Sequence, residues 1–148
     1  MANIGVFCSS LDGEKIFSET AKELGAFLAK ENYSLVYGGG KLGLMGDLAK
    51  SVKKNNSEVI SVIPSYLNKP NITFSESDEI YETKDLFERK KKLIELSDVL
   101  IALPGGVGTL DEIFDVIALF ALGETCLLYT SDAADDLLCV DLGGRRII

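Results

Sequence analysis

The sequence predicts an α/β fold, a Rossmann-like parallel sheet with helices on both faces. Short apolar segments, each long enough for one buried strand, alternate along the chain with segments whose apolar residues recur at helical spacing. The strand segments are apolar on both faces, as expected where helices cover each side of a sheet. In such sheets ligands bind beyond the carboxyl ends of the strands, so the loops there are the first candidates for a site.

The first half of the chain alternates clearly. Residues 3–7 form a short apolar run that gives way to a polar loop, which predicts a buried strand. Residues 14–30 follow as an amphipathic helix, with apolar side chains on one face and charged side chains on the other. A second strand is predicted at residues 34–37, and Gly38-Gly39-Gly40 ends it before a helix over about residues 44–54.

The second half continues the alternation after one irregular stretch. A third strand is predicted at residues 58–63, and Pro64 ends it. Periodicity then weakens as far as Asp85, with a short extended piece expected at residues 79–83. Three further elements complete the pattern: a charged helix over residues 85–97, an apolar strand over residues 99–103 and a helix over about residues 109–122.

Composition limits the functions that the chain can have. The 148 residues, 47% of them hydrophobic, suit one compact domain, and the net charge of -8 argues against a nucleic-acid-binding surface. No run approaches membrane-spanning length and no apolar leader opens the chain, so we expect a cytoplasmic protein that makes no membrane contact. Histidine is absent, which excludes Ser-His-Asp and Cys-His catalysis. Because the three cysteines also lack metal-ligand spacing, we expect no metal site.

From Cys126 onward the chain resembles an in-frame translation of a transposon-type sequencing-library adapter. One adapter segment encodes residues 126–136, and a second segment in the same frame encodes residues 140–148. A natural C-terminal strand and turn is the alternative. We therefore expect residues 1–125 to form the domain and residues 126–148 to be an adapter-derived tail that does not belong to the fold.

A glycine-rich run follows the strand predicted at residues 99–103 and opens the next helix: Pro104-Gly105-Gly106-Val107-Gly108-Thr109. Backbone N–H groups at such a helix N-terminus can surround an anion, and glycine lets a ligand approach the backbone closely. Thr109 is expected to cap the helix and to bond a phosphate oxygen. A tight turn without a ligand is the alternative. We expect this run to converge with the loops at residues 8–13 and 38–43 as a phosphate site.

Two acidic residues follow in the expected first turn of that helix, Asp111 and Glu112. Negative charge stabilises a helix N-terminus, and Glu112 stands at capping-box distance from Thr109, so structural roles for both stay open.

The basic run Arg89-Lys90-Lys91-Lys92 lies on the preceding helix. We expect Lys91 and Lys92 on its solvated face and either Arg89 or Lys90 to reach the loops, because one helix cannot point all four side chains the same way. The run from Gly38 to Gly43 lacks the spacing of a dinucleotide fingerprint and the ending of a P-loop, and Met45 beyond it is more typical of a core residue.

These residues together resemble the LONELY GUY family of cytokinin riboside 5′-monophosphate phosphoribohydrolases, over residues 1 to about 124. The likeness rests on Val6-Phe7-Cys8-Ser9-Ser10, Tyr37-Gly38-Gly39-Gly40, Gly43-Leu44-Met45-Gly46, Val62-Ile63-Pro64, Glu88-Arg89-Lys90 and the hallmark PGGxGTxxE at residues 104–112. It implies hydrolysis of the N-glycosidic bond of a nucleoside 5′-monophosphate, either cytokinin riboside 5′-monophosphate or AMP. The products would be a free base and ribose 5-phosphate, and no cofactor or metal is implied.

The resemblance assigns catalysis to Arg89 and Glu112. A carboxylate at Glu112 would stabilise an oxocarbenium-like sugar and orient water, while Arg89 would hold phosphate or the departing charge. It assigns substrate binding to Gly39, Gly40, Met45, Lys90, Gly105, Gly106, Val107, Gly108, Thr109 and Asp111. The chain departs from the family pattern at Phe87, Asn71 and Ala118-Leu119, where the family has His, Glu and Thr-Trp, and this bears on base specificity.

The resemblance also implies a homodimer for a full-length parent, with further C-terminal strands that are missing where the tail begins. Two other functions remain open. A non-catalytic nucleotide-binding module of the same fold would keep the phosphate loops and not need Glu112 chemically. Amino-acid decarboxylation would need a Schiff-base lysine and a cofactor pocket, which no segment suggests.

Overall fold

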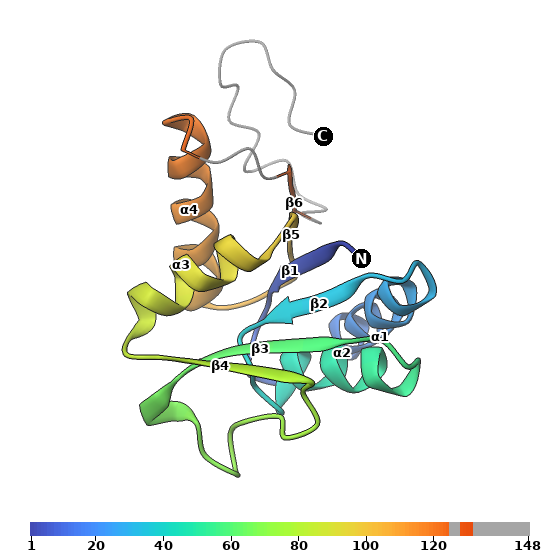
Figure 1. Cartoon of the computed structure of the whole chain (residues 1–148). Helices are drawn as coiled ribbons and strands as arrows, with labels where there is room; N and C mark the ends of the chain where they lie inside the picture. The colour runs from blue at the N-terminus through green and yellow to red at the C-terminus, as the bar shows by residue number, and fades with distance from the viewer. Residues whose placement is uncertain (125–127, 132–148) are drawn as a thin grey trace.

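The computed structural model describes residues 1–124 and the backbone of residues 128–131. In this part of the chain, parallel strands form one six-stranded sheet in the order β4-β3-β2-β1-β5-β6. Helices α1 and α2 lie on one side of the sheet, and α3 and α4 on the other (Figure 1). The predicted α/β fold is therefore confirmed. The chain winds outward from β1 to β4 and then returns to β5, which makes the β1–β5 boundary the switch point where such sheets bind ligands.

The elements of the first half follow their predicted bounds to within one residue: β1 (Asn3–Phe7), α1 (Lys15–Lys30), β2 (Ser34–Tyr37), α2 (Gly43–Lys54) and β3 (Val59–Pro64). All residues of β2 and β3 are buried, as their apolar sequences predict for central strands. Pairing of Gly5 with Val36 and with Leu100 places β1 between β2 and β5.

The second half contains η1 (Ser65–Leu67), β4 (Glu79–Thr83), α3 (Leu86–Leu96), β5 (Val99–Ala102) and α4 (Val107–Ala121). Asp85 caps α3, since its side chain accepts a hydrogen bond from the Glu88 N–H at 2.8 Å. Helix α4 starts two residues before the predicted Thr109. Gly106 is extended and completes the turn from β5, so the helix can begin at Val107.

Strand β6 (Leu128–Ser131) pairs with the far edge of β5, with Tyr129 opposite Leu100. The expectation that nothing after residue 125 joins the fold is therefore wrong for this backbone. Its sequence, Leu-Tyr-Thr-Ser, is typical of a strand, and β5 offers unpaired backbone groups at that edge. The adapter origin of the segment remains a prediction, and residues 125–127 and 132–148 lie outside the described part.

The core consists of two clusters, one on each face of the sheet. Alternate strand residues point to opposite faces, so Leu35 and Tyr37 pack under α1 and α2, while Val36 packs under α3 and α4. Leu48 of α2 and Leu93 of α3 are fully buried members of the two clusters. Within the described residues, no helix is both long and apolar enough to cross a membrane.

Candidate active site

Three loops meet at the carboxyl edge of the sheet, as predicted. The Ser9 N–H donates to the Pro104 carbonyl at 3.3 Å, and the Met45 N–H donates to the Ser9 carbonyl at 3.1 Å. Gly43 approaches Leu11 so closely that a Cβ added to it would lie 2.5 Å from the Leu11 backbone. The loops after β1, β2 and β5 are therefore in direct contact beside the switch point of the sheet.

Arg89 joins three elements at this edge. Its Nε–H donates to the Val62 carbonyl at 3.0 Å, its Nη2 to the Gly38 carbonyl at 3.3 Å and its Nη1 to Glu112 Oε1 at 3.0 Å. Only 12% of its side chain is exposed. Of the two candidates on α3, Arg89 is thus the residue that reaches the loops, and its guanidinium plane is fixed on three sides.

Glu112 is buried on the inner face of α4, with 6% exposure, and forms an ion pair with Arg89. Burial raises the pKa of Glu112 above its usual range, Asp111 adds to the rise, and the Arg89 charge opposes it. A carboxyl group with a raised pKa can exchange a proton closer to neutral pH than an exposed one. This arrangement suits acid–base or electrostatic work at a reacting centre.

The early start of α4 corrects three predictions about its first residues. Thr109 does not cap the helix, because Gly106 is the N-cap residue and makes no side-chain cap. Asp111 and Glu112 do not lie in the first turn, which contains no acidic residue in this fully described segment. The capping-box explanation of Glu112 is therefore wrong, and pairing with Arg89 is the structural role that the contacts support.

The hallmark glycines divide into two kinds. A Cβ on Gly105 would lie 2.1 Å from the buried Thr109 hydroxyl, so packing within the turn explains that glycine. A Cβ on Gly106 or Gly108 would meet no described atom within 4 Å, and neither has a positive φ. Gly108 even lies within α4, where glycine costs roughly 1 kcal/mol relative to alanine. These two glycines, with exposed Val107 between them, fit a ligand that approaches the backbone N–H groups of the helix start.

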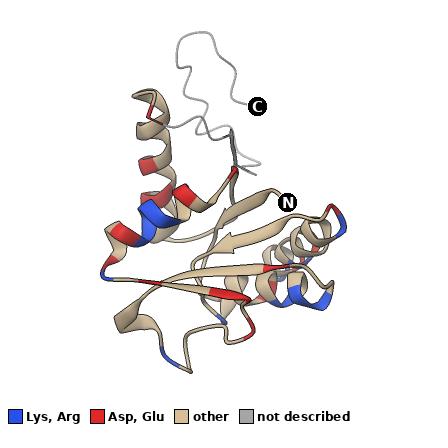
Figure 2. Cartoon of the chain, viewed as in Figure 1, with Lys and Arg blue, Asp and Glu red and all other residues tan. Residues whose placement is uncertain are grey.

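Lys90 makes a second connection between α3 and α4. Its Nζ contacts Asp111 at 2.9 Å and also pairs with Asp115, so the basic stretch of α3 lies beside acidic positions of α4 (Figure 2). Burial acts to lower the pKa of Lys90, but hydrogen bonds and charges of Asp115 and Asp111 outweigh it and raise the pKa. Sequence reasoning missed Asp115, although its i,i+4 spacing from Asp111 was a usable signal.

The other two lysines of the run behave differently from each other. Lys91 lies on the solvated face as predicted and pairs with Glu95 at 3.7 Å. Lys92 is half-buried and lies 5.0 Å from the centre of the Tyr81 ring, so its prediction as a purely solvated residue is wrong.

The second glycine loop lies in the interior. Gly39 has a positive φ of 78°, its carbonyl accepts from the Phe74 N–H at 2.9 Å, and Gly40 forms an antiparallel bridge with Thr73. Met45 belongs to the hydrophobic cluster under α1 and α2, which agrees with its prediction as a core residue. Gly39, Gly40 and Met45 are thus buried, whereas Gly106 and Gly108 are exposed.

Three groups at the site were not predicted: the carbonyls of Gly38 and Val62 and the thiol of Cys8. A Cβ on Gly38 would lie 1.9 Å from Arg89 Nη2. The glycine at this position was therefore the one feature of the sequence that could have indicated a close approach to its backbone. Burial raises the pKa of Cys8 to about 12, with the Glu112 charge adding to the rise and the Arg89 charge opposing it. Cys8 is therefore a neutral thiol near the ion pair.

Comparison with known sequences gives a family and named relatives. Residues 45–128 match the family described as "Possible lysine decarboxylase". The chain is 43% identical over 119 residues to a probable cytokinin riboside 5′-monophosphate phosphoribohydrolase of Oryza sativa subsp. japonica, covering 80% of this chain and 52% of that protein. It is 43% identical over 121 residues to a cytokinin riboside 5′-monophosphate phosphoribohydrolase of Arabidopsis thaliana, covering 81% and 57%. The chain spans about half the length of these curated relatives.

Solved structures share the fold. A molybdenum cofactor binding protein from Rippkaea orientalis matches with a TM-score of 0.71 at 24% identity, over 88% of this chain and 77% of that one. A molybdenum cofactor carrier protein from Chlamydomonas reinhardtii matches with a TM-score of 0.69 at 26% identity, over 86% and 75%. The structures that share this fold are thus named for binding, whereas the sequence relatives are named for hydrolysis, and the fold alone does not define the function.

Proposed function

Because the chain belongs to the family described as "Possible lysine decarboxylase", which is the LONELY GUY family that its motifs resemble, we propose that it is a nucleoside 5′-monophosphate phosphoribohydrolase. It hydrolyses the N-glycosidic bond of cytokinin riboside 5′-monophosphate or AMP to a free base and ribose 5-phosphate. One observation carries the proposal: Glu112, 3.0 Å from Arg89 in a buried ion pair, belongs to the same helix whose start contains Gly106 and Gly108, the two glycines with free space beside them.

The hallmark turn has the role of phosphate anchor in this proposal. The N-terminus of α4 presents unpaired N–H groups and a positive dipole end to the 5′-phosphate, and Thr109 adds a hydroxyl. Anchoring the phosphate converts binding energy into positioning of the sugar, so that its C1′ is held for reaction. Lys90 and Asp111 complete the set of substrate-binding groups that we propose at the α3–α4 boundary.

Glu112 has the catalytic role. As the bond between C1′ and the base nitrogen breaks, the electron pair leaves with the base and the sugar becomes oxocarbenium-like. The Glu112 carboxylate stabilises that positive charge and orients a water molecule, whose oxygen bonds to C1′. The water gives up one proton to Glu112, which can accept it because its pKa is raised. The departing base takes up one proton from solvent and Glu112 afterwards releases its proton to solvent, so no net proton is gained or lost.

Arg89 holds Glu112 in position and places a positive charge beside the reacting groups. Its three observed hydrogen bonds, to Val62, Gly38 and Glu112, use three of the five guanidinium N–H groups and fix its plane in the interior. We therefore assign the 5′-phosphate mainly to the hallmark turn, and the stabilisation of departing negative charge to Arg89.

Two alternatives make different predictions. A non-catalytic binding module would bind the nucleotide and release no base. Proteins of similar fold that are named as molybdenum cofactor binding and carrier proteins keep a binding role in view for this architecture. A lysine decarboxylase would need a lysine whose pKa is lowered for Schiff-base chemistry. Lys90, which follows Arg89 on α3 and whose charge acts on Glu112, has a raised pKa, which argues against that chemistry.

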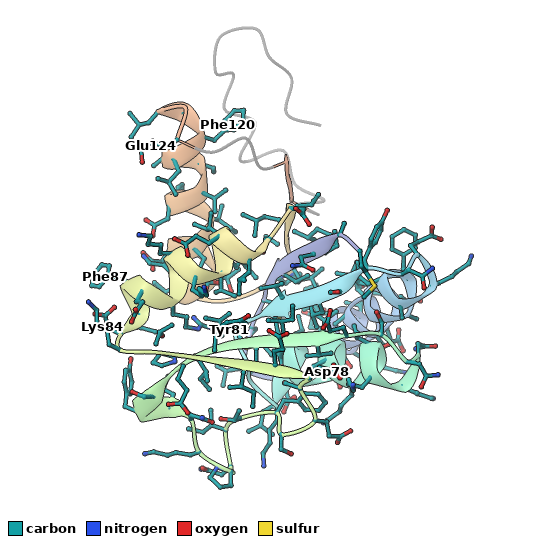
Figure 3. The ribbon with its side chains drawn as sticks, viewed as in Figure 1. Asp78, Tyr81, Lys84, Phe87, Phe120 and Glu124 are labelled. Carbon is teal, nitrogen blue, oxygen red and sulfur yellow. The ribbon has the colours of Figure 1, made fainter. Side chains whose placement is uncertain are left out.

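The proposal extends to a homodimer acting in the cytoplasm. Leu110 and Phe114 lie one turn apart on α4, and both are exposed. Phe87 projects outward from the start of α3, on the same side of the sheet (Figure 3). Three exposed large apolar residues on the two helices of one sheet face support a protein–protein contact there.

We also propose that residues 126–148 are adapter-derived. Sequencing the source locus through codon 148 tests this: an uninterrupted genomic reading frame that encodes the same residues would refute it. The parent protein in this proposal consists of residues 1–125 followed by the continuation that the source locus encodes.

The experiment for the proposed activity uses AMP and the parent protein, with the 148-residue chain in parallel. Wild-type protein should release adenine and ribose 5-phosphate. Glu112→Gln should bind AMP and lose about 10²-fold or more in turnover, whereas Glu95→Gln on the solvated face of α3 should retain full turnover. Binding without base release by the wild type would establish the non-catalytic alternative, and full turnover by Glu112→Gln would disprove the catalytic assignment.

A further inference from the structure

Tyr37 is a fully buried tyrosine immediately before the second glycine loop. It is the last residue of β2, its exposure is 0%, and its ring packs in the cluster under α1 and α2. Its hydroxyl reaches forward along the chain and donates to the Gly40 carbonyl at 3.1 Å. This hydrogen bond spans the turn at residues 38–40, in which Gly39 has a positive φ.

Two serine hydroxyls interact with the Tyr37 hydroxyl: Ser61, which is buried, and Ser77, which is partly buried. The Ser61 and Ser77 hydroxyls are 2.6 Å apart, and Ser77 donates to the Phe74 carbonyl at 2.9 Å. Burial raises the pKa of Tyr37, and hydrogen bonding with Ser61 and Ser77 opposes the rise. The Phe74 N–H in turn donates to the Gly39 carbonyl at 2.9 Å. The turn is thus held both by Tyr37 and by the segment that follows β3.

The same turn contacts the proposed catalytic pair. The Gly38 carbonyl lies between Tyr37 and Gly39 in the chain and accepts from Arg89 Nη2 at 3.3 Å. Arg89 Nη1 then meets Glu112 at 3.0 Å. The guanidinium is planar, so a rotated Gly38 carbonyl would move or tilt the edge that holds Glu112.

We propose that Tyr37 is a positioning residue of this site: its buried hydroxyl fixes the turn at residues 38–40 and, through the Gly38 carbonyl, orients Arg89 against Glu112. Tyr37 cannot touch a substrate, because none of its surface is exposed. The inference rests on the proposed function only in so far as Arg89 and Glu112 carry out hydrolysis; the orientation of Arg89 is testable without it.

A purely structural role for Tyr37 predicts different results. If the ring only fills the core, phenylalanine would preserve the packing and leave Arg89 unaffected. If the hydroxyl positions the turn, Tyr37→Phe would leave the Gly40 carbonyl without its buried donor and loosen the hold on Arg89. The hydroxyl, rather than the ring, is therefore the group to remove.

The first measurement is side-chain hydrogen exchange of the Arg89 Nε–H by NMR in ¹⁵N-labelled parent protein, with Arg89→Lys identifying the resonance. Tyr37→Phe should speed exchange about fivefold, the factor expected for loss of one buried hydrogen bond. Ser77→Ala should act in the same direction and serves as the second variant if Tyr37→Phe does not fold. Tyr33→Phe, at the edge of the same cluster, should change nothing.

General loss of stability is the main confounding effect. Val52→Ala in α2 removes core packing at a fully buried position outside the hydroxyl network, and it should lower the melting temperature without selectively exposing the Arg89 Nε–H. Exchange in Tyr37→Phe equal to that in wild type, or matched by Val52→Ala at equal stability, would overturn the proposal.

The second measurement is AMP hydrolysis. Tyr37→Phe should lower kcat about fivefold with KM within about twofold of wild type, because the phosphate anchor on α4 is untouched. The pH dependence of kcat should also shift, since a displaced Arg89 changes the pKa of Glu112. If wild-type protein releases no base, the proposed function fails while the exchange measurement still decides the role of Tyr37.

Discussion

Arg89 illustrates how one side chain can define a site at the scale of a residue. Its three hydrogen bonds go to two strand ends and one helix, and two of the three acceptors are backbone carbonyls. Every residue has a backbone carbonyl, so a sequence does not indicate which carbonyls accept a hydrogen bond from a side chain. The identities of Arg89 and Glu112 could therefore be predicted from their motifs, whereas the carbonyls of Gly38 and Val62 could not.

Arg89→Lys should reduce turnover about 10²-fold with the fold retained. A single ammonium group cannot reach Val62, Gly38 and Glu112 together, and it lacks the planar fork that fixes the Glu112 carboxylate. Base release from AMP and the melting temperature of the parent protein are the measurements. Lys91→Arg, at an exposed position two residues further along α3, is the matched control and should leave both turnover and melting temperature unchanged. Near-wild-type turnover of Arg89→Lys would contradict the assigned role.

Asp111→Asn should move the acidic limb of the kcat–pH profile to lower pH. The ionised form of Glu112 is the active one in our proposal, so activity rises as pH increases through its pKa. The negative charge of Asp111 contributes to raising that pKa, so removing the charge lowers it and extends activity toward acid. Glu23→Gln on exposed α1 should leave the profile in place, and a shift of Asp111→Asn toward higher pH would refute the electrostatic argument.

At the scale of the element, α4 shows where sequence patterns stop being informative. Apolar periodicity located the helix but placed its start at Thr109, because glycine and an exposed valine give no helical signal. The two missing residues changed the roles of Thr109, Asp111 and Glu112 together. By contrast, β1, β2 and α1 were predicted closely, since polar or glycine residues follow soon after each of them, the two strands are apolar runs and α1 has a clear helical period.

Gly108→Ala should stabilise the protein and weaken nucleotide binding. A Cβ there meets no described atom, and alanine is favoured over glycine within a helix by about 0.5–1 kcal/mol, so the melting temperature should rise. The same methyl group would stand where we propose that the phosphate approaches, so Kd for AMP should increase about tenfold. Thermal unfolding and calorimetric titration measure the two effects.

Gly25→Ala in α1 is the contrasting variant. A Cβ there would lie 2.7 Å from the Ser51 side chain and 2.8 Å from the Leu48 carbonyl, so this glycine serves helix packing. It should destabilise the protein without a specific effect on AMP affinity. Equal responses of the two variants would mean that Gly108 has no ligand-related role.

At the scale of the whole molecule, the alternation of strands and helices predicted the architecture, but the docking of α3 on α4 could not be predicted. Arg89 and Glu112 are 23 residues apart, and their pairing depends on how two helices pack on one face of the sheet. Helical periodicity identifies a buried face and gives no register between neighbours. The same limit applies to Lys90 and Asp115.

The apolar residues on the outer side of α4 lead to a prediction about assembly. Phe114→Glu should dissociate the proposed homodimer, because a carboxylate buried in an apolar contact loses its hydration without gaining a partner. The dissociation constant should rise by about 10²-fold or more if Phe114 is a central contact residue. Sedimentation velocity of the parent protein over a range of concentrations measures this directly.

Phe27 provides the matched control for that experiment. It has the same exposure as Phe114, 54%, but it belongs to α1 on the opposite face of the sheet. Because both side chains are exposed in the single chain, Phe114→Glu and Phe27→Glu should have similarly small effects on the fold, and only Phe114→Glu should alter assembly. Dissociation by Phe27→Glu alone would place the interface on α1 and α2, and a wild-type protein that stays monomeric at every concentration would exclude the dimer.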